Sequence, residues 1–311
     1  MKRSIIIDGG AGRIIAAIPA LLKHVRNNPD DDISIVIGAW DALLWGIPEL
    51  QNITYSMDTK GLFDNIIVKS DEVLTPEPYR LPRYFRQEIS LAQGFDEEIN
   101  GTQDHKGLGV PVMVLNKGEE KGAANLIKDV KQQQQKQKTI IIQPFGRGAN
   151  RVDETDIVDE STRSIEPHVY LKLIKKLSTK YNLIFFGEKN LVVPNDNLTF
   201  KPEGDLRFWA AVTEACDYFV GCDSLGQHMA RSFNVPGTVI IGSTYAVNTS
   251  YPDYFNIIEK PDIAKKYSPI RISGLDCHLA DRMNDRCMDF TDDEINEMYK
   301  SIVKDIEVKV K

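Results

Sequence analysis

Residues 217–236 have the sequence DYFVGCDSLGQHMARSFNVP, which indicates the fold class of this chain. Residues 218–220 are apolar and favour a strand, residues 221–224 break it, and residues 225–233 can form a helix that ends before Pro236. A strand that runs directly into a helix leaves backbone N–H groups pointing out of the turn, where the helix dipole adds partial positive charge. The stretch therefore predicts an α/β domain with a turn suited to a phosphate or another anion.

Composition excludes several classes of protein. The chain has 311 residues, 42% hydrophobic residues and a formal net charge of −7. That length suits two ordinary domains, and the acidic balance gives no overall attraction to nucleic acid or to anionic membranes. There is no apolar run long enough to span a membrane, and the four cysteines contain no CxxC pair. We expect a cytoplasmic protein with reduced thiols and no metal site.

The first residues read as the opening unit of a doubly wound sheet. An apolar strand at 4–8 leads into a glycine loop at 9–12 and an apolar helix at 14–25. The same pattern occurs in dinucleotide-binding proteins, which carry an acidic residue at the tip of the second strand. The second strand here, 33–37, ends in Gly-Ala-Trp instead. An NAD-dependent oxidoreductase is therefore disfavoured.

A loop rich in arginine and aromatic residues, 76–86, lies in the first half of the chain, among short strands expected at 66–68 and 112–114. Arginine pairs with phosphate, and aromatic rings stack on sugars or bases. A solvated loop that packs its rings on a neighbour is the alternative. As a functional loop it would contact an acceptor substrate through Tyr79, Arg80 and Arg83.

A polar, glutamine-rich run at 131–138 is the best candidate for a domain boundary. After it, the strand 139–145 ends in Gly146 and Arg147, and the strand 181–186 ends in Gly187 and Glu188. Repeated strand–helix units make this half Rossmann-like. The predicted parts are an N-terminal domain at 1–135, a C-terminal domain at 136–290, and a helix at 291–311 that crosses back toward the N-terminal domain.

The sequence resembles the ADP-heptose:lipopolysaccharide heptosyltransferases. Asp223-Ser224, His228-Met229-Ala230 and Gly242-Ser243-Thr244 are similar to the donor-binding segment of that family, although the family's glycine stands one place later here, at Gly226. The run from Gly12 to Leu21 is similar to a second family motif. In the family the residue after that first glycine is an aspartate, the proposed general base, where this chain has Arg13. Asp8 is the nearest carboxylate in sequence.

The resemblance implies the GT-B architecture, in which two Rossmann-like domains face each other across a cleft. It implies a metal-independent, inverting glycosyltransferase that uses a nucleotide-sugar as co-substrate and needs no other cofactor. The acceptor would be a glycan, a lipid-linked sugar or modified DNA. The implied catalytic residues are Asp8 and Arg13, and the implied donor-binding residues are Gly146, Arg147, Gly187, Glu188, Asp223, Ser224, Gly226, Gln227 and His228.

Two alternatives stay open at the level of sequence. One is a glycosyltransferase that acts on a hydroxymethylated DNA base, because an arginine–aromatic loop suits that acceptor. The other is a non-catalytic protein that binds a sugar nucleotide, because an arginine in place of the base cannot accept a proton at any working pH.

Overall fold

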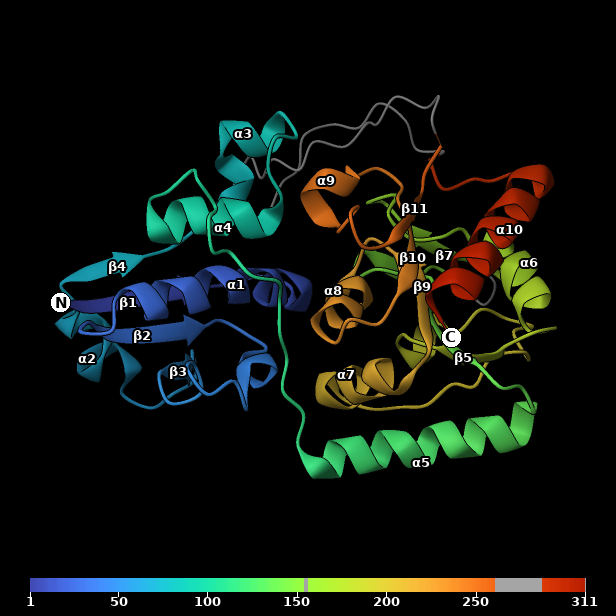
Figure 1. The fold of residues 1–311 in the computed structure, drawn as a ribbon, viewed down its shortest axis with the longest axis horizontal. Helices are drawn as coiled ribbons and strands as arrows, with labels where there is room; N and C mark the ends of the chain where they lie inside the picture. Colours follow the sequence, from blue (N-terminus) through green and yellow to red (C-terminus); the bar gives the residue numbers. More distant parts are fainter. Residues whose placement is uncertain (154–155, 261–286, 311) are drawn as a thin grey trace. The chain divides into compact units, whose positions relative to one another are not determined.

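The computed structural model describes residues 1–153, 156–260 and 287–310. The chain divides into two compact units, Met1–Asn116 and Lys117–Lys311, and each unit has its own parallel sheet (Figure 1). This confirms the predicted fold class, two Rossmann-like domains with separate sheets. Among the described residues, no helix is both long enough and apolar enough to span a membrane.

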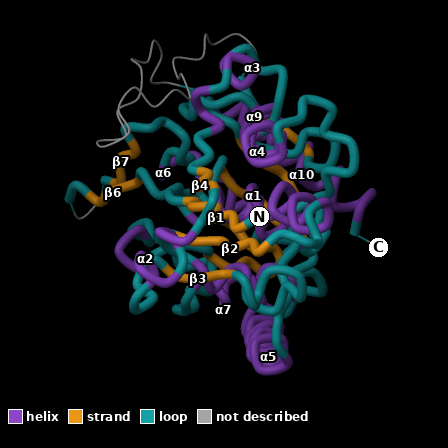
Figure 2. The backbone as a smooth tube through the Cα atoms, turned by 90° about the vertical axis from the view of Figure 1, so that its left-hand side faces the viewer, coloured by secondary structure: helices purple, strands orange, loops and turns teal. Residues whose placement is uncertain are grey.

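The first unit is built on a four-stranded parallel sheet with the order β3-β2-β1-β4, which Figure 2 shows side by side. The buried positions of the inner strand β1 are apolar, and Ile5 and Ile7 have no exposed surface. The elements are β1 (Lys2–Ile7), α1 (Ala11–Asn27), β2 (Asp32–Ile37), β3 (Thr54–Ser56), α2 (Leu62–Asn65), β4 (Glu72–Leu74), α3 (Pro82–Phe85) and α4 (Leu91–Asn100). Helices α1 and α4 pack against each other.

The two short strands predicted in the first half are wrong. Ile67–Lys69 forms a 3₁₀ turn, and residues 112–114 have no regular secondary structure and belong to none of the described sheets. Val68 and Val114 are both exposed. A short β-branched run forms a strand when it can pack on a sheet face, and these runs have no such face to cover.

The second unit is built on a five-stranded parallel sheet with the order β11-β10-β9-β5-β8, and a separate antiparallel pair joins β6 to β7. The elements are α5 (Lys117–Gln134), β5 (Thr139–Gln143), β6 (Ala149–Arg151), β7 (Ile157–Asp159), α6 (Pro167–Leu177), β8 (Asn182–Phe185), α7 (Leu206–Ala215), β9 (Tyr218–Cys222), α8 (Leu225–Ser232), β10 (Gly237–Ile240), α9 (Ala246–Thr249), β11 (Asn256–Ile258) and α10 (Asp292–Lys309).

The boundary between the units lies before α5 and not in the glutamine-rich run, so the predicted first domain at 1–135 is too long. Helix α5 packs along α7, as Figure 1 shows, and against β8. The buried Arg207 of α7 donates to Glu119 of α5 through Nε at 2.9 Å and Nη2 at 2.6 Å. Gln134 at the end of α5 accepts from the Leu183 amide at 2.6 Å. These bonds join α5 to the second unit.

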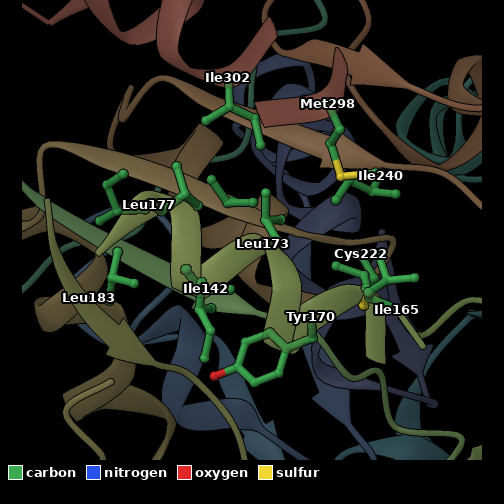
Figure 3. Packing of buried hydrophobic residues seen from close by; sticks show 14 of the residues in the cluster. Ile142, Ile165, Tyr170, Leu173, Leu177, Leu183, Cys222, Ile240, Met298 and Ile302 are labelled. Carbon is green, nitrogen blue, oxygen red and sulfur yellow. The ribbon is translucent and has the colours of Figure 1, made fainter. Parts of the chain in front are cut away.

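The C-terminal helix belongs to the second unit. Helix α10 packs on α6, β10 and β11. Its buried residues Met298 and Ile302 share one hydrophobic cluster with Ile240 of β10 and Leu173 of α6, as Figure 3 shows. The apolar stripe of α10 is thereby buried against its own unit, which offsets the entropic cost of ordering the helix. A capping box joins Thr291 and Glu294 at its start.

Candidate functional site

The carboxyl edge of the second sheet carries the predicted donor-binding residues. In open α/β sheets, ligands bind outside the carboxyl ends of the strands, where the strand order reverses. Strand β5 leads to β8 on one side and, later, to β9 on the other, so the order reverses between β5 and β9. Gly146 follows β5 and Ser224 follows β9. A Cβ atom added to Gly146 would lie 3.6 Å from Ser224 Oγ, so the structure brings these two predicted residues together.

Gln143, the last residue of β5, joins the two strand ends. Its Nε2 donates to Ser224 Oγ at 3.3 Å, and its Oε1 accepts from the Gly226 amide at 2.7 Å. Ser224 itself makes no side-chain capping bond to α8 among the described residues. The Gln143 side chain, which comes from a neighbouring strand, therefore accepts a hydrogen bond from the first turn of α8, as an N-cap side chain normally does. Sequence reasoning missed Gln143, although a glutamine at the end of an otherwise apolar buried strand is a signal of this kind.

The position of Gly226 has a reason in the packing of this chain. A Cβ atom there would lie 2.6 Å from Gln143 Oε1 and 2.6 Å from Phe219 Cε2. Only a residue without a side chain allows the Gln143 carbonyl to reach the amide of the first helical turn. The glycine therefore stands where the bridge from β5 requires it, one place later than in the resembling family.

Asp223 and Gln227 form a buried network beneath the turn. Gln227 Nε2 donates to Asp223 Oδ1 at 2.7 Å and to the Thr249 carbonyl at 3.1 Å, and Thr244 Oγ1 donates to Asp223 Oδ2 at 2.8 Å. Gln227 has no exposed surface. These bonds join the β9–α8 turn to the segment that follows β10. The structure therefore places Gln227 below the surface of the turn, which differs from the prediction that it points toward a bound ligand.

His228 is buried as well, with 7% of its surface exposed. Its Nδ1 lies 2.8 Å from the Tyr251 hydroxyl, and the two rings meet edge to face with centroids 5.6 Å apart. Burial lowers the pKa of His228 to about 4, against the opposing charge of Asp223. The imidazole is therefore neutral at physiological pH and adds no positive charge to this edge.

The loop after β5 is held from behind. The Gly146 amide donates to Ser164 Oγ at 2.9 Å, and Ser164 Oγ donates to Asp159 Oδ2 at 2.5 Å. Burial raises the pKa of Asp159, but hydrogen bonds from Ser161 and Ser164 outweigh it and leave the pKa below its usual range. Asp159 is thus a charged anchor that fixes the backbone around Gly146.

Several polar groups of this edge face outward. Ser224 is partly exposed at the start of α8, and Arg147 is exposed after β5. Gly187 and the exposed Glu188 follow β8, which pairs in parallel with β5 and therefore ends at the same edge. These four groups are predicted donor-binding residues that a ligand can reach from solvent, whereas Gly146 itself is buried.

Asp8 stands at the carboxyl end of β1 in the first unit. Its Oδ1 accepts from the Gly9 amide at 2.6 Å. A Cβ atom on Gly38, which follows β2, would lie 2.6 Å from the same oxygen. Asp8 is exposed and closes the glycine loop. Its role as a base stays a prediction.

Arg13 is buried in the first unit, with 6% of its surface exposed. Nη1 donates to Glu77 Oε1 at 2.8 Å and Nη2 donates to the Pro76 carbonyl at 2.7 Å. The guanidinium carbon also lies 5.2 Å from the Tyr79 ring centroid and 5.4 Å from that of Phe95. Its two terminal nitrogens therefore hold the turn at 76–77, and a catalytic role of Arg13 stays a prediction.

The predicted acceptor loop is only partly open to solvent. The Tyr79 ring meets Tyr84 edge to face at 5.5 Å. Arg83 donates to Glu97 of α4 and lies 3.4 Å from Glu88. Arg80 is exposed. Of the three predicted acceptor-binding residues, Tyr79 and Arg83 thus make structural contacts, and Arg80 faces solvent.

Comparison with known proteins gives a fold and no close relative. No protein-family model matches the chain, and no curated protein matches it.

Among the described residues, no group of three His, Cys, Asp or Glu side chains is placed to hold a metal ion.

Solved structures of glycosyltransferases share the fold. ADP-heptose LPS heptosyltransferase II of E. coli matches with a TM-score of 0.67 and 14% identity, over 99% of each chain. The dodecameric iron-containing heptosyltransferase TibC, in complex with ADP-D-beta-D-heptose, matches with 0.64 and 11%, over 98% of this chain and 76% of TibC. A family 9 glycosyl transferase from Veillonella parvula matches with 0.56 and 15%, over 83% and 85%. The predicted heptosyltransferase-like GT-B fold is confirmed.

Proposed function

We propose that this chain is a glycosyltransferase that takes a sugar from a nucleotide-sugar donor. The observation that carries the proposal is the β5–β9 edge: Gly146 and Ser224 meet where the strand order reverses, beside the start of α8. In a chain with the heptosyltransferase fold, such an edge suits the diphosphate of a nucleotide-sugar. TibC, with which this chain shares that fold, has been solved with ADP-D-beta-D-heptose.

The second unit would bind the donor through groups that are already ordered. The first turn of α8 adds partial positive charge, Ser224 offers a hydroxyl, and the exposed Arg147 offers a guanidinium that fits a phosphate. The exposed carboxylate of Glu188 can accept hydrogen bonds from ribose hydroxyls. Stabilising the departing diphosphate in this way needs no metal ion, and we propose metal-independent, inverting transfer.

The first unit would receive the acceptor. Arg80 is an exposed cation on the 76–86 loop, which suits an acceptor that carries a phosphate, such as a phosphorylated glycan or a lipid-linked sugar. Modified DNA is the alternative acceptor, and its binding would weaken steeply as salt rises because phosphate contacts release counterions.

Activity on a panel of substrates tests the proposal. Purified protein is incubated with ADP-heptose and with the common UDP-, GDP- and CDP-sugars, each with lipid-linked, glycan and hydroxymethylated-DNA acceptors, with and without EDTA. We expect one donor to give a glycosylated product, found by mass spectrometry, with the same rate in EDTA. Donor binding without product from any acceptor would favour the sugar-nucleotide-binding alternative, and no binding at all would contradict both.

A further inference from the structure

The first sheet has its own reversal of strand order. Strand β1 leads to β2 and β3 on one side, and β4 pairs with β1 on the other. The reversal lies between β1 and β4, so the same rule assigns a ligand-binding edge to their carboxyl ends. The loop and helix that follow β1 contribute Asp8 and Arg13 to this edge, and the turn that follows β4 contributes Glu77.

The carboxylate of Glu77 is held by Arg13 while part of it stays accessible. The two side chains are joined by the 2.8 Å bond from Arg13 Nη1 to Glu77 Oε1, and their exposed fractions are 5% for Arg13 and 23% for Glu77. Arg13 Nη2 fixes the backbone one residue earlier, at the Pro76 carbonyl. The buried partner is thus the cation, and the partly open one is the carboxylate.

A second carboxylate supports the same turn from α4. The Glu77 backbone hydrogen-bonds the Glu98 side chain. Glu98 Oε2 is buried without a hydrogen-bond partner among the described residues, and so is Arg13 Nε. Burial raises the pKa of Glu98, against the hydrogen bond from Glu77. Two helices, α1 and α4, therefore fix the position of Glu77. A catalytic group needs a fixed position because it must meet its substrate at a defined distance.

We propose that Glu77 is the general base of this transferase and that Arg13 is its positioning residue. The inference rests on the proposed function and names the residue that accepts the proton. Asp8, the carboxylate suggested by the sequence, competes for this role, but its Oδ1 accepts from the amide next to it and packs against Gly38.

The proposed step transfers a proton to Glu77 while the sugar moves from the diphosphate to the acceptor. A Glu77 carboxylate oxygen takes the proton of the acceptor hydroxyl as the acceptor oxygen bonds to the anomeric carbon of the donor. The bond from that carbon to the diphosphate oxygen breaks, and its electron pair leaves with the nucleoside diphosphate. Without a sugar acceptor, water takes the same place, and the products are the free sugar and the nucleoside diphosphate.

Hydrolysis of the donor tests this without knowledge of the acceptor. Release of nucleoside diphosphate is measured for ADP-heptose and the common nucleotide-sugars with full-length wild type and with Glu77→Gln. Glutamine keeps an oxygen for Arg13 but is not basic, so we expect kcat to fall about a hundredfold or more, with donor KM and melting temperature unchanged. The matched control is Glu72→Gln, because Glu72 also pairs with an arginine, Arg3 at 2.5 Å, at the opposite end of β1 and β4.

Rescue separates a base from a structural residue. Formate added to Glu77→Ala should restore part of the hydrolysis rate, since a small carboxylate can enter the vacated space, and should do nothing for Asp8→Ala. Arg13→Lys keeps the charge and loses the forked contact, so we expect about a tenfold lower kcat with an unchanged donor KM.

Failure of the inference and failure of the proposed function look different. If Glu77→Gln hydrolyses donor at about the wild-type rate, or if Asp8→Asn loses turnover while Glu77→Gln keeps it, Glu77 is not the base and the transferase proposal stands. If wild type binds none of the nucleotide-sugars, the proposed function falls and the inference falls with it. Binding without any hydrolysis by wild type also contradicts a base that acts on water.

Discussion

Single residues at the carboxyl edge of the second sheet fall into two groups. Asp223, Gln227 and His228 are buried, and their side chains hydrogen-bond to other groups of the protein. Ser224 and Arg147 face outward instead. The sequence places all five at one strand-to-helix edge but does not tell which of them a ligand can reach. That distinction depends on partners far along the chain, such as Thr244 and Tyr251, which no local pattern reveals.

Gly226→Ala tests whether the close approach of Gln143 is required. The added Cβ would meet Gln143 Oε1 and Phe219 Cε2 at 2.6 Å, so we expect a loss of about 1–3 kcal/mol in the free energy of unfolding. The control is Gly122→Ala in α5, where an added Cβ meets no described atom within 4 Å outside the backbone of its own helix, and alanine should stabilise the helix by about 0.5–1 kcal/mol. Denaturant unfolding measures both. Equal effects of the two substitutions would contradict the packing described for Gly226.

His228 predicts a pH dependence of stability. Its pKa is depressed from 6.5 to about 4 in the folded chain, so between these values the unfolded chain binds a proton that the folded chain does not. Stability therefore rises with pH through this window and is lost on acidification, by about 3 kcal/mol in total at about 1.4 kcal/mol per unit.

Urea unfolding at a series of pH values between 7 and 4 checks this. His228→Asn should show a shallower loss of stability than wild type, and His168→Asn, at a half-exposed surface site, should follow wild type. A wild-type slope that His228→Asn leaves unchanged would show that this histidine is not the group responsible.

Elements were predicted from sequence where the signal is local. The strand–turn–helix at 217–236 and the buried strand predicted at 139–145 both follow from neighbouring residues, and the structure contains them, with the strand shortened to 139–143. The short strands at 66–68 and 112–114 fail because strand formation depends on a sheet face that sequence does not supply. Gln143 and Glu77 were missed for a related reason: each acts on an element far away in the chain.

Gln143→Ala tests the bridge from β5 to α8. It removes the acceptor of the Gly226 amide and the donor to Ser224, so we expect a loss of about 1–2 kcal/mol in the free energy of unfolding. Gln133→Ala, at an exposed position of α5, is the matched control and should change stability by less than about 0.5 kcal/mol. A cost at Gln143 no greater than at Gln133 would mean that α8 needs no cap from β5.

At the scale of the whole molecule, the sequence predicts the two sheets but not the point where one unit ends. A polar, low-complexity run normally marks a linker, yet here it closes a helix whose inner face buries Ala123, Ile127 and Val130. The remaining polar residues are the solvated face of the same helix. Periodicity over 117–134, and not composition, is the signal that assigns α5 to the second unit.

Two fragments test this boundary. A fragment that starts at residue 117 keeps α5 and its ion pair with Arg207, so we expect one cooperative unfolding transition. A fragment that starts at 136 uncovers the face of α7 on which α5 packs. It also lacks Glu119, the carboxylate that pairs with Arg207. We expect it to unfold at a clearly lower denaturant concentration. Equal stability of the two fragments would place α5 outside the second unit.

Calorimetric titration tests whether the β5–β9 edge holds the diphosphate of a nucleotide-sugar. Wild type, Ser224→Ala and Glu77→Gln are each titrated with ADP, UDP, GDP and CDP and with ADP-heptose. We expect one nucleotide to bind wild type and Glu77→Gln alike, and to bind Ser224→Ala roughly ten to a hundredfold more weakly, because one hydrogen bond to a charged phosphate is lost. Nucleotide binding that Ser224→Ala leaves unchanged, or no binding to wild type, would contradict the claim.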